Sequence, residues 1–283
     1  MKQKILTLQT LYREGQIRLK DRGIEECQLD AWYLLEYITG ISKASYYGDP
    51  NRELSAAQAE EYRKCIEKRS ERIPLQHITG VQEFMGHEFF VNEHVLIPRQ
   101  DTEILVEHTL DKVEDGKKVL DMCTGSGCIL LSILKRYQVR GTGADISSEA
   151  LQVAERNRKH LALPRVEWLQ SDLFEKIEEK YDVIVSNPPY IQTGVIESLQ
   201  EEVRLHDPYI ALDGKEDGLY FYRRIIEDAK AYLEDGGWLL FEIGYDQAEP
   251  VTRLMEQAGY SEIHVKKDLS GLDRVAGARY NKN

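Results

Sequence analysis

The stretch VLDMCTGSG, residues 119–127, decides the fold class of this chain of 283 residues. Its apolar start predicts a strand over 118–123, and the two glycines predict a tight turn that leads into a helix from Cys128. Glycine is needed in such a turn because a side chain would block the close approach of a ligand to the backbone. Open sheets of parallel strands bind ligands at the carboxyl ends of their strands, where this turn lies. The stretch therefore predicts an α/β fold with a ligand site at the turn.

Expected strands and helices alternate along the chain from residue 117 onward. The expected strands are 118–123, 142–146, 166–170, 181–186, 238–243, 263–267 and 274–278, and the expected helices are 128–137, 148–160, 218–233 and 247–258. This alternation predicts a mostly parallel sheet with helices on both faces. The last two strands follow each other without a helix, which predicts an antiparallel edge.

The first quarter of the chain has a different pattern. Apolar residues recur at helical spacing, and Ser55–Gln58 has the spacing of a capping box that opens a helix. Aromatic residues around Gly86 then predict a short β-hairpin, and Asp101 or Thr102 is expected to cap a helix that ends at Leu110. We therefore expect three parts, a helical domain (1–75), a hairpin linker (76–97) and an α/β domain (98–283).

The charge of the chain is uneven. The 37 Lys and Arg against 49 Asp and Glu give a net charge of −12. Residues 1–75 hold 13 basic and 12 acidic residues, whereas residues 76–283 hold 24 and 37. A protein that binds a phosphate backbone needs a basic surface, so direct binding of nucleic acid is not expected. The acidic part suits a basic or neutral protein partner.

Neither a membrane nor a metal is expected. No apolar run approaches the ~18–20 residues that span a bilayer, and the apolar stretch within residues 1–9 is too short for a signal peptide. The four cysteines, Cys27, Cys65, Cys123 and Cys128, form no CxxC pair and have no histidine cluster beside them. A zinc site and a disulfide framework are therefore both disfavoured, and we expect a cytoplasmic protein.

Two cofactor classes fit the glycine turn. The dinucleotide fingerprint needs a third glycine three residues after the second, and this chain has Leu130 there. An acidic residue just before the turn, here Asp121, is instead typical of S-adenosylmethionine sites. The positively charged sulfonium and ammonium groups of that cofactor interact favourably with a carboxylate and with backbone carbonyl oxygens, and they do not need a phosphate-binding loop. The turn therefore favours S-adenosylmethionine.

Two further carboxylates support this interpretation. Asp145 is expected near the end of the next strand, where it can accept hydrogen bonds from both ribose hydroxyls. Asp172 follows the third strand and can meet the adenine amino group, with Leu173 or Phe174 against the ring. Three carboxylates near the ends of three successive strands make a coherent cofactor site.

The four residues Asn187-Pro188-Pro189-Tyr190 follow the apolar strand 181–186 and predict the acceptor site. The prolines stiffen the loop, so the Asn187 side-chain oxygen and the Pro188 carbonyl can serve as two fixed acceptors. Acceptors that hold both N–H bonds of an amide or amino nitrogen favour a pyramidal nitrogen whose lone pair points at the methyl group. Tyr190 can pack on the planar acceptor. The motif predicts methylation of such a nitrogen and leaves open whether protein, DNA or RNA carries it.

With these motifs the sequence resembles the HemK/PrmC family, the peptide-chain release factor glutamine N5-methyltransferases, over almost the whole chain. The stretches that carry the resemblance are 74–80 (PLQHITG), 83–86, 96–103 (LIPRQDTE), 121–127, 186–191, 211–214, 217–219 and 267–275 (KDLSGLDRV). The resemblance implies a class I methyltransferase fold, Rossmann-like with a mostly parallel seven-stranded sheet, a small N-terminal helical domain and a β-hairpin linker.

The resemblance also implies a reaction and a set of residues. The family methylates the side-chain amide of the glutamine in the Gly-Gly-Gln loop of release factors, with S-adenosylmethionine as donor, and the N-terminal domain would help dock the release factor. The implied cofactor-binding residues are Asp121, Cys123, Thr124, Gly125, Ser126, Gly127, Asp145, Asp172, Leu173 and Asn187. The implied catalytic residues are Asn187, Pro188, Pro189 and Tyr190. Cys123 stands where the family usually has glycine, and Leu173 where it often has an aromatic residue.

Other interpretations remain open at this point. A sister enzyme that methylates a glutamine of a ribosomal protein shares the fold and the Asn-Pro-Pro-Tyr motif. A methyltransferase acting on a nucleic-acid base uses a similar motif, but it must extract the base and hold the backbone, which the acidic charge disfavours. The missing third glycine disfavours a nicotinamide-dependent oxidoreductase, and the intact acceptor motif disfavours a non-catalytic binding module.

Overall fold

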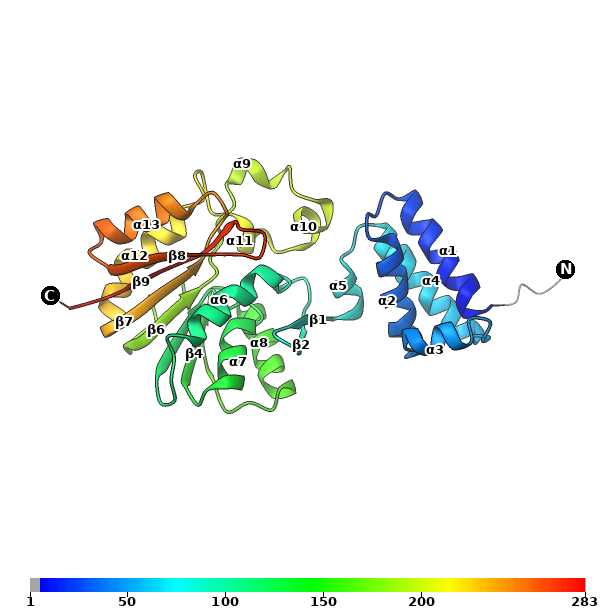
Figure 1. The fold of residues 1–283 in the computed structure, drawn as a ribbon, viewed down its shortest axis with the longest axis horizontal. Coiled ribbons are helices and arrows are strands. Elements are labelled where there is room, and N and C mark those ends of the chain that lie inside the picture. The colour runs from blue at the N-terminus through cyan, green and yellow to red at the C-terminus, as the bar shows by residue number, and fades with distance from the viewer. Residues whose placement is uncertain (1–5, 283) are drawn as a thin grey trace. The chain divides into compact units, whose positions relative to one another are not determined.

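The computed structural model describes residues 6–282 (Figure 1). Residues 1–5, which form part of the stretch considered for a signal peptide, and residue 283 lie outside the described residues. The chain divides into two compact units, Met1–Gly80 with Gln200–His206, and Val81–Leu199 with Asp207–Asn283. Each unit has a hydrophobic core of its own, so each is described by itself.

The first unit is helical. Its helices are α1 (Leu8–Asp21), α2 (Cys27–Thr39), α3 (Lys43–Gly48), α4 (Ala56–Ser70), α5 (Leu75–Thr79) and α10 (Glu201–His206). Leu11, Leu35 and Tyr62 are among the buried side chains through which α1, α2 and α4 pack. Helix α4 begins as predicted, because Ser55 Oγ accepts from the Gln58 amide while the Gln58 side chain accepts from Ser55 N–H.

Helix α10 belongs to this first unit although it follows the Asn-Pro-Pro-Tyr motif in the sequence. Arg69 of α4 is buried and donates to Asp30 Oδ2 of α2 at 2.7 Å and to Glu202 Oε1 of α10 at 3.0 Å. Arg72 lies 3.2 Å from the same Glu202 oxygen. A guanidinium that is removed from water needs such partners, so these ion pairs fix α10 on the bundle.

The second unit opens with the predicted hairpin, in which β1 (Val81–Phe84) pairs antiparallel with β2 (His87–Phe90). The sheet that follows has seven strands in the order β5-β4-β3-β6-β7-β9-β8. The strands are β3 (Lys118–Met122), β4 (Arg140–Asp145), β5 (Glu167–Gln170), β6 (Tyr181–Ser186), β7 (Leu233–Glu242), β8 (Ser261–Lys267) and β9 (Asp273–Arg279). Strands β3 to β7 are parallel, and β9 is antiparallel to both of its neighbours, as predicted.

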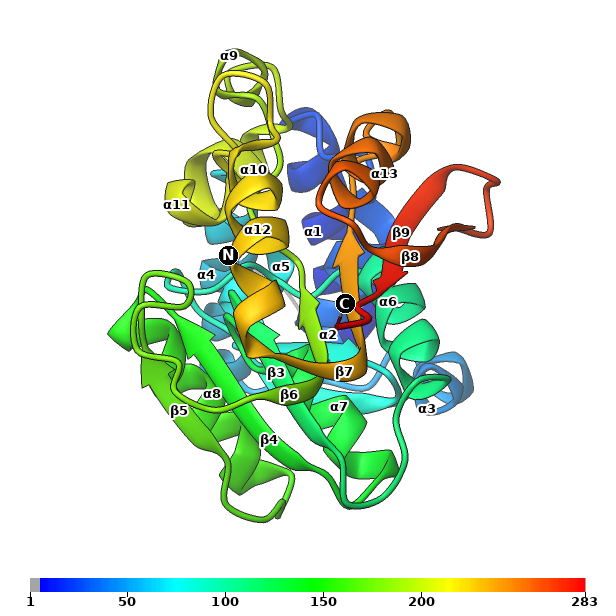
Figure 2. The same ribbon diagram turned by 90° about the vertical axis from the view of Figure 1, so that its left-hand side faces the viewer.

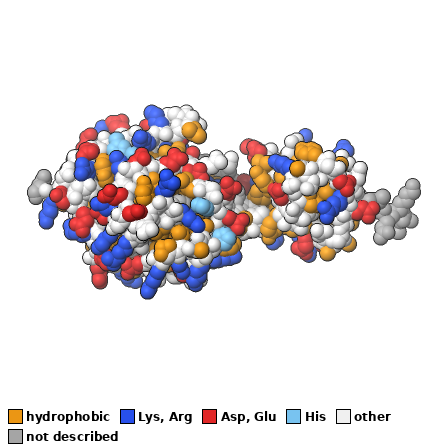
Figure 3. All heavy atoms as spheres, turned by 60° about the horizontal axis from the view of Figure 1, so that its bottom comes forward, with side chains coloured by type: hydrophobic (Ala, Val, Ile, Leu, Met, Phe, Trp, Pro, Cys, Tyr) orange, Lys and Arg blue, Asp and Glu red, His pale blue; other side chains and the backbone are white. Residues whose placement is uncertain are grey.

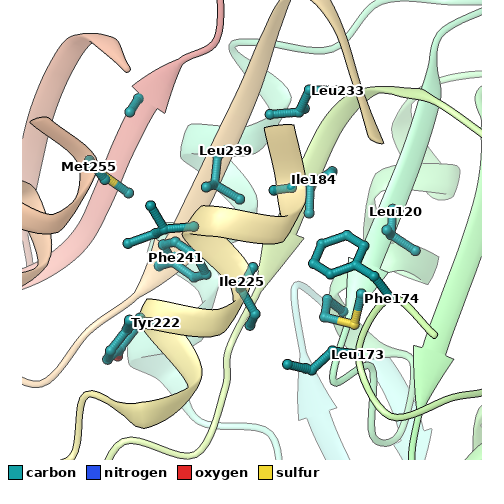
Figure 4. Close-up of a cluster of buried hydrophobic side chains, with 14 of the residues drawn as sticks. Leu120, Leu173, Phe174, Ile184, Tyr222, Ile225, Leu233, Leu239, Phe241 and Met255 are labelled. Atoms are coloured by element: carbon teal, nitrogen blue, oxygen red, sulfur yellow. The ribbon is translucent and has the colours of Figure 1, made fainter. Parts of the chain in front are cut away.

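Helices cover both faces of this sheet (Figure 2). They are α6 (Gln100–Leu110), α7 (Cys128–Arg136), α8 (Ser148–His160), α12 (Tyr220–Tyr232) and α13 (Ala248–Gln257). Two short helices of this unit, α9 (Thr193–Ile196) and α11 (Tyr209–Leu212), lie in the segment between β6 and α12. Side chains of a strand alternate between the faces. Leu120 and Ile184 thus join α12 and α13 in one buried cluster (Figure 4), whereas Val119 and Val183 join α6 and α7 in another. The apolar strands are covered on both sides, which explains their near-continuous hydrophobic character.

The structure corrects some predicted details. The predicted cap of α6 is wrong, because the helix begins at Gln100 and its N-cap, Arg99, makes no side-chain cap hydrogen bond. The Thr102 side chain is buried, and Asp101 pairs with Arg274 at 3.2 Å, so neither is free to cap. Strand β7 starts at Leu233, five residues before the predicted start at 238, and the short helices α9 and α11 had no predicted counterpart.

The surface of the second unit carries both signs of charge on the face drawn in Figure 3, where basic and acidic side chains are interspersed. Among the residues described, no helix is long and apolar enough to cross a membrane.

Candidate active site

The turn after β3 is built from strained backbone and one buried carboxylate. Gly125 and Gly127 have φ of 54° and 77°, and Cys123 has φ of 63° although it carries a Cβ. Asp121 is fully buried, and its Oδ2 accepts from Thr124 Oγ at 2.6 Å and from Leu130 N–H at 3.4 Å. Burial raises the pKa of Asp121 to about 7, against the effect of these two hydrogen bonds. Asp121 therefore holds the turn to the first residues of α7.

Asp145 ties the same turn to the next strand. Its Oδ2 accepts from Gly125 N–H at 2.8 Å, and its Oδ1 accepts from Ser147 N–H at 2.9 Å. Burial raises the pKa of Asp145, and the backbone hydrogen bonds oppose that rise. Each carboxylate oxygen keeps acceptor capacity beyond its single backbone bond, so Asp145 can also receive hydrogen bonds from a ligand.

A pocket lies at the carboxyl ends of β3, β4, β5 and β6. The predicted site residues that line it are Cys123, Thr124, Gly125, Ser126, Asp145, Asp172, Leu173, Asn187 and Pro189. The predicted residues that lie outside its lining are Asp121, Gly127, Pro188 and Tyr190. The predicted set is therefore divided into residues that line this pocket and residues that lie beside its lining.

The part of the pocket predicted to receive adenine is bordered by Leu173 and Asp172. Leu173 is 4% exposed and has a φ of 48°, and Asp172 forms an ion pair with Arg224 at 3.0 Å. The Phe174 ring instead belongs to the buried cluster of Figure 4 and stacks on Tyr232, with 4.8 Å between the ring centroids. Of the two side chains considered for the ring face, Leu173 is therefore the one that lines the pocket.

Asn187 stands beside the glycine turn. Strand β6 pairs with β3 so that Ser186 lies opposite Met122, and Ser186 Oγ donates to the Met122 carbonyl at 2.6 Å. Asn187 Nδ2 donates to Thr102 Oγ at 3.4 Å. Within residues 6–282 no donor reaches the Asn187 Oδ1 atom, so this oxygen is left for a ligand.

Tyr190 is anchored at both its side chain and its backbone. Its hydroxyl donates to Glu242 Oε1 at 3.1 Å, and its carbonyl accepts from Gln247 Nε2 at 2.9 Å. A Cβ at Gly218 would collide with the Tyr190 carbonyl oxygen, so glycine is required there for the loop to pack this closely. Burial is the main cause that raises the pKa of the Tyr190 hydroxyl. Tyr190 thus fixes the end of the Asn-Pro-Pro-Tyr loop in the fold.

Three residues that support this loop were not predicted from the sequence, namely Thr102, Glu242 and Gln247. Thr102 was interpreted only as a helix cap, and the other two were not singled out. Glu242 ends the apolar strand β7 in the way that Asp121 and Asp145 mark the ends of their strands, so the same pattern could have identified it. No comparable pattern marks Thr102 or Gln247, because their roles depend on contacts with a distant loop.

Comparisons with known proteins agree with this architecture. The model of the PrmC N-terminal domain matches residues 10–80, and that of the methyltransferase small domain matches residues 99–204. The crystal structure of a methyltransferase from Pyrococcus furiosus superposes with a TM-score of 0.56 at 18% identity, over 76% of this chain and 100% of that one. At that identity the similarity concerns the fold alone.

The fold and the site together define a class I methyltransferase. The release factor glutamine methyltransferase of Geobacter sulfurreducens is 40% identical over 92% of each chain, and that of Caulobacter vibrioides is 41% identical over 95% of each. The chain belongs to the release factor glutamine methyltransferase family.

Proposed function

We propose that this protein transfers a methyl group from S-adenosylmethionine to the side-chain amide nitrogen, N5, of the glutamine in the Gly-Gly-Gln loop of peptide-chain release factors. The observation that carries the proposal is the position of Asn187, whose free Oδ1 lines the same pocket as the glycine turn after β3. The names of the full-length relatives supply the acceptor protein.

The residues that line the pocket fit S-adenosylmethionine as the methyl donor. A Cβ at Gly125 would meet no atom within 4 Å, so the bare backbone of the turn leaves space for a ligand to lie against it. Asp145 offers carboxylate oxygens to a ribose, and Leu173 offers an apolar wall to an adenine ring. When bound, S-adenosylmethionine supplies an electrophilic methyl group on a sulfonium. We assign Thr124, Gly125 and Ser126 to the methionine end, with Asp121, Cys123 and Gly127 shaping the turn.

The acceptor side orients an amide without a strong base. Asn187 Oδ1 and the Pro188 carbonyl can each accept one N–H of the substrate amide, and Pro189 limits the freedom of the loop between them and Tyr190. Hydrogen bonds aimed at a nitrogen that becomes positive strengthen during the transfer, and one such bond contributes about 3–4 kcal/mol at best. The proton becomes acidic once the methyl group is on nitrogen, so a strong general base is not required.

The two units divide the work in this proposal. Residues 1–75 of the helical unit would dock the release factor, the segment 76–97, which contains the hairpin of β1 and β2, would serve as the linker, and residues 98–283 would carry the chemistry. The net charges of the parts, near zero for 1–75 and strongly acidic beyond, suit a protein partner more than a nucleic acid.

The test is methyl transfer from labelled S-adenosylmethionine to a purified release factor. The control substrate carries a Gln→Ala change in the Gly-Gly-Gln loop. Label in the natural release factor and none in the control would establish both the acceptor and the atom that is modified. Label in neither, but in a ribosomal protein or in nucleic acid, would overturn the proposed acceptor and leave the fold class standing.

A further inference from the structure

We propose that the edge of the sheet around the pocket is an apolar docking face for the release factor, and that Leu269, in the turn between β8 and β9, is its outer anchor. This docking role rests on the proposed function for the identity of the partner. Leu269 does not line the pocket, so the docking face extends the contact with the substrate protein beyond the residues already described.

The exposed large apolar side chains of the second unit lie at one edge of its sheet. The pairing of Glu242 with Val275 and of Lys267 with Asp273 brings the turn between β8 and β9 to the carboxyl end of β7. In the described part of this unit, the connections at the opposite edge carry no exposed large apolar side chain. Apolar surface gathered in one place marks an interaction site more often than single scattered residues do. The exposed side chains at the carboxyl edge include Tyr209, Ile210, Tyr245, Leu269 and Leu272.

The pocket opens at this same edge. It lies at the carboxyl ends of the parallel strands, and Ile210 both lines it and is exposed to solvent. A glutamine carried by a folded protein can enter the pocket only if the surface around that glutamine covers the edge. The position of the apolar side chains around the pocket therefore favours the substrate protein, here the release factor, as their occupant.

The turn that carries Leu269 projects from the sheet (Figure 2) and is held by its own hydrogen bonds. The Asp268 N–H donates to the Leu272 carbonyl at 2.8 Å, and Asp268 Oδ1 accepts from the N–H groups of Ser270 and Leu272, each at 2.9 Å. Gly271 supplies the φ of 82° that the turn needs. Leu269 is fully exposed on this framework. Because the turn is already ordered, a partner that covers Leu269 loses little affinity to ordering the backbone.

Arg274 fastens the turn to the start of α6. Its Nη2 atom lies 3.1 Å from Asp268 Oδ2 in the turn and 3.2 Å from Asp101 Oδ2 in the first turn of α6. The residue after Asp101 is Thr102, which lines the pocket. Leu269 is therefore carried by a turn whose position is fixed relative to the pocket.

The charges beside Leu269 favour a protein as the partner. Lys267 Nζ lies 2.6 Å from Asp273 Oδ1, and Arg274 is held by its two aspartates. Cations that already have carboxylate partners offer little to a phosphate backbone, which is bound by unpaired basic side chains. The turn thus presents an apolar side chain beside neutralised charges, which suits an apolar patch on a protein surface.

The deciding variant is Leu269→Ala. It removes the apolar contact and keeps the turn, whose hydrogen bonds use backbone atoms and the Asp268 carboxylate. We expect KM for the release factor to rise about tenfold, because most of a leucine side chain is no longer buried in the complex. The kcat at saturating release factor and the Kd for S-adenosylmethionine should stay within about twofold of the wild type. Steady-state methyl transfer and calorimetric titration of the donor measure these quantities.

Ser270→Ala is the matched control, and Leu269→Met is the conservative variant. Ser270 is the exposed neighbour of Leu269 in the same turn, and its backbone N–H still donates to Asp268 after the substitution. KM for the release factor should be unchanged in Ser270→Ala and near the wild-type value in Leu269→Met. A wild-type KM in Leu269→Ala would overturn the docking face, and so would equal increases in Leu269→Ala and Ser270→Ala.

Direct binding separates the docking face from the proposed reaction. The Kd between the release factor and the enzyme saturated with S-adenosylhomocysteine is measured by biolayer interferometry for the wild type and Leu269→Ala. A Kd about tenfold weaker in the variant supports the docking face, even if the release factor is not methylated and the proposed acceptor is rejected. Methylation with a Kd and KM that do not depend on Leu269 keeps the proposed function and overturns the docking face. A wild type that binds nucleic acid or a ribosomal protein, and not the release factor, overturns the partner proposed for it.

Discussion

The turn after β3 and the loop after β6 lie side by side, yet they are held in different ways. The turn is supported mainly by residues close in sequence, since Asp121 accepts from Thr124 and Leu130, and only Asp145 comes from another strand. The loop is supported by residues that are distant in sequence. Thr102 holds its first residue, and Glu242 and Gln247 hold its last one. The turn is therefore close to a self-contained motif, whereas the loop depends on the assembled unit.

The largest effect is expected from Asn187→Ala in the loop. The substitution removes an acceptor that is proposed to strengthen during methyl transfer, so kcat should fall by about 10²–10³. The affinity for S-adenosylmethionine should change little, because Thr124, Gly125 and Asp145 are untouched. Single-turnover methyl transfer and calorimetric titration of the donor measure the two quantities separately. Near-normal turnover would show that Asn187 is not needed to orient the substrate amide, and the acceptor role proposed for the loop would be rejected.

This comparison also explains what the sequence could predict. Val119–Gly127 predicted the strand, the turn and the cofactor class, because the turn uses side chains within ten positions and glycines that are required by positive φ. The alternation of strands and helices likewise predicted the parallel sheet and its antiparallel edge. These features arise from local propensity and periodicity, which a single sequence displays.

The support of the loop could not be predicted in the same way. Asn187–Tyr190 was recognisable as an acceptor motif, but the contact of Asn187 with Thr102 joins positions 85 apart. A threonine near a helix start has a common local interpretation as a cap, and nothing local shows that its side chain turns inward. Tyr190 was expected to pack on the acceptor, which stays a prediction. The hydrogen bond from its hydroxyl to Glu242 joins positions 52 apart, so no local pattern shows it.

The next largest effect concerns Asp121 and pH. Its pKa is raised to about 7 in the folded protein, so protonation stabilises the fold. Its contribution is fully present below the unfolded pKa near 4 and is lost as pH rises toward 7, by roughly 1.4 kcal/mol per pH unit. Asp121→Asn can still accept from Thr124 and Leu130 and does not titrate. The stability of the variant relative to the wild type should therefore rise between pH 5 and pH 7.

Urea unfolding of both proteins at pH 5, 6 and 7, followed by tryptophan fluorescence, measures that difference. Other groups titrate equally in both proteins, so they cancel in the comparison. If the difference in the free energy of unfolding does not change with pH across this range, Asp121 is ionised throughout. Thr124 and Leu130 would then donate to a charged carboxylate at every pH tested.

A smaller effect is expected where the turn meets the donor. Asp145→Ala removes the carboxylate that accepts hydrogen bonds from Gly125 N–H and Ser147 N–H, together with the proposed ribose contacts. The affinity for S-adenosylmethionine should therefore weaken by about 1.5–3 kcal/mol. Asp145→Asn keeps one acceptor oxygen, so its affinity for S-adenosylmethionine should lie between those of the wild type and Asp145→Ala. Calorimetric titration of S-adenosylmethionine ranks the three, and kcat at saturating donor should stay within a few-fold of the wild type. Equal affinities would remove Asp145 from the ribose role.

The smallest effect is expected from Cys123→Gly, because three contributions nearly cancel. The φ of 63° costs a residue with a Cβ about 1–2 kcal/mol, and glycine removes that strain. Glycine also loses about 0.5–1 kcal/mol more conformational entropy on folding, and the side chain of Cys123 packs against the core cluster under α12. We therefore expect a change of thermal midpoint within about 2–4 °C and unchanged donor affinity. A loss well beyond that range would show that the turn, like the loop, depends on side-chain packing from the assembled unit.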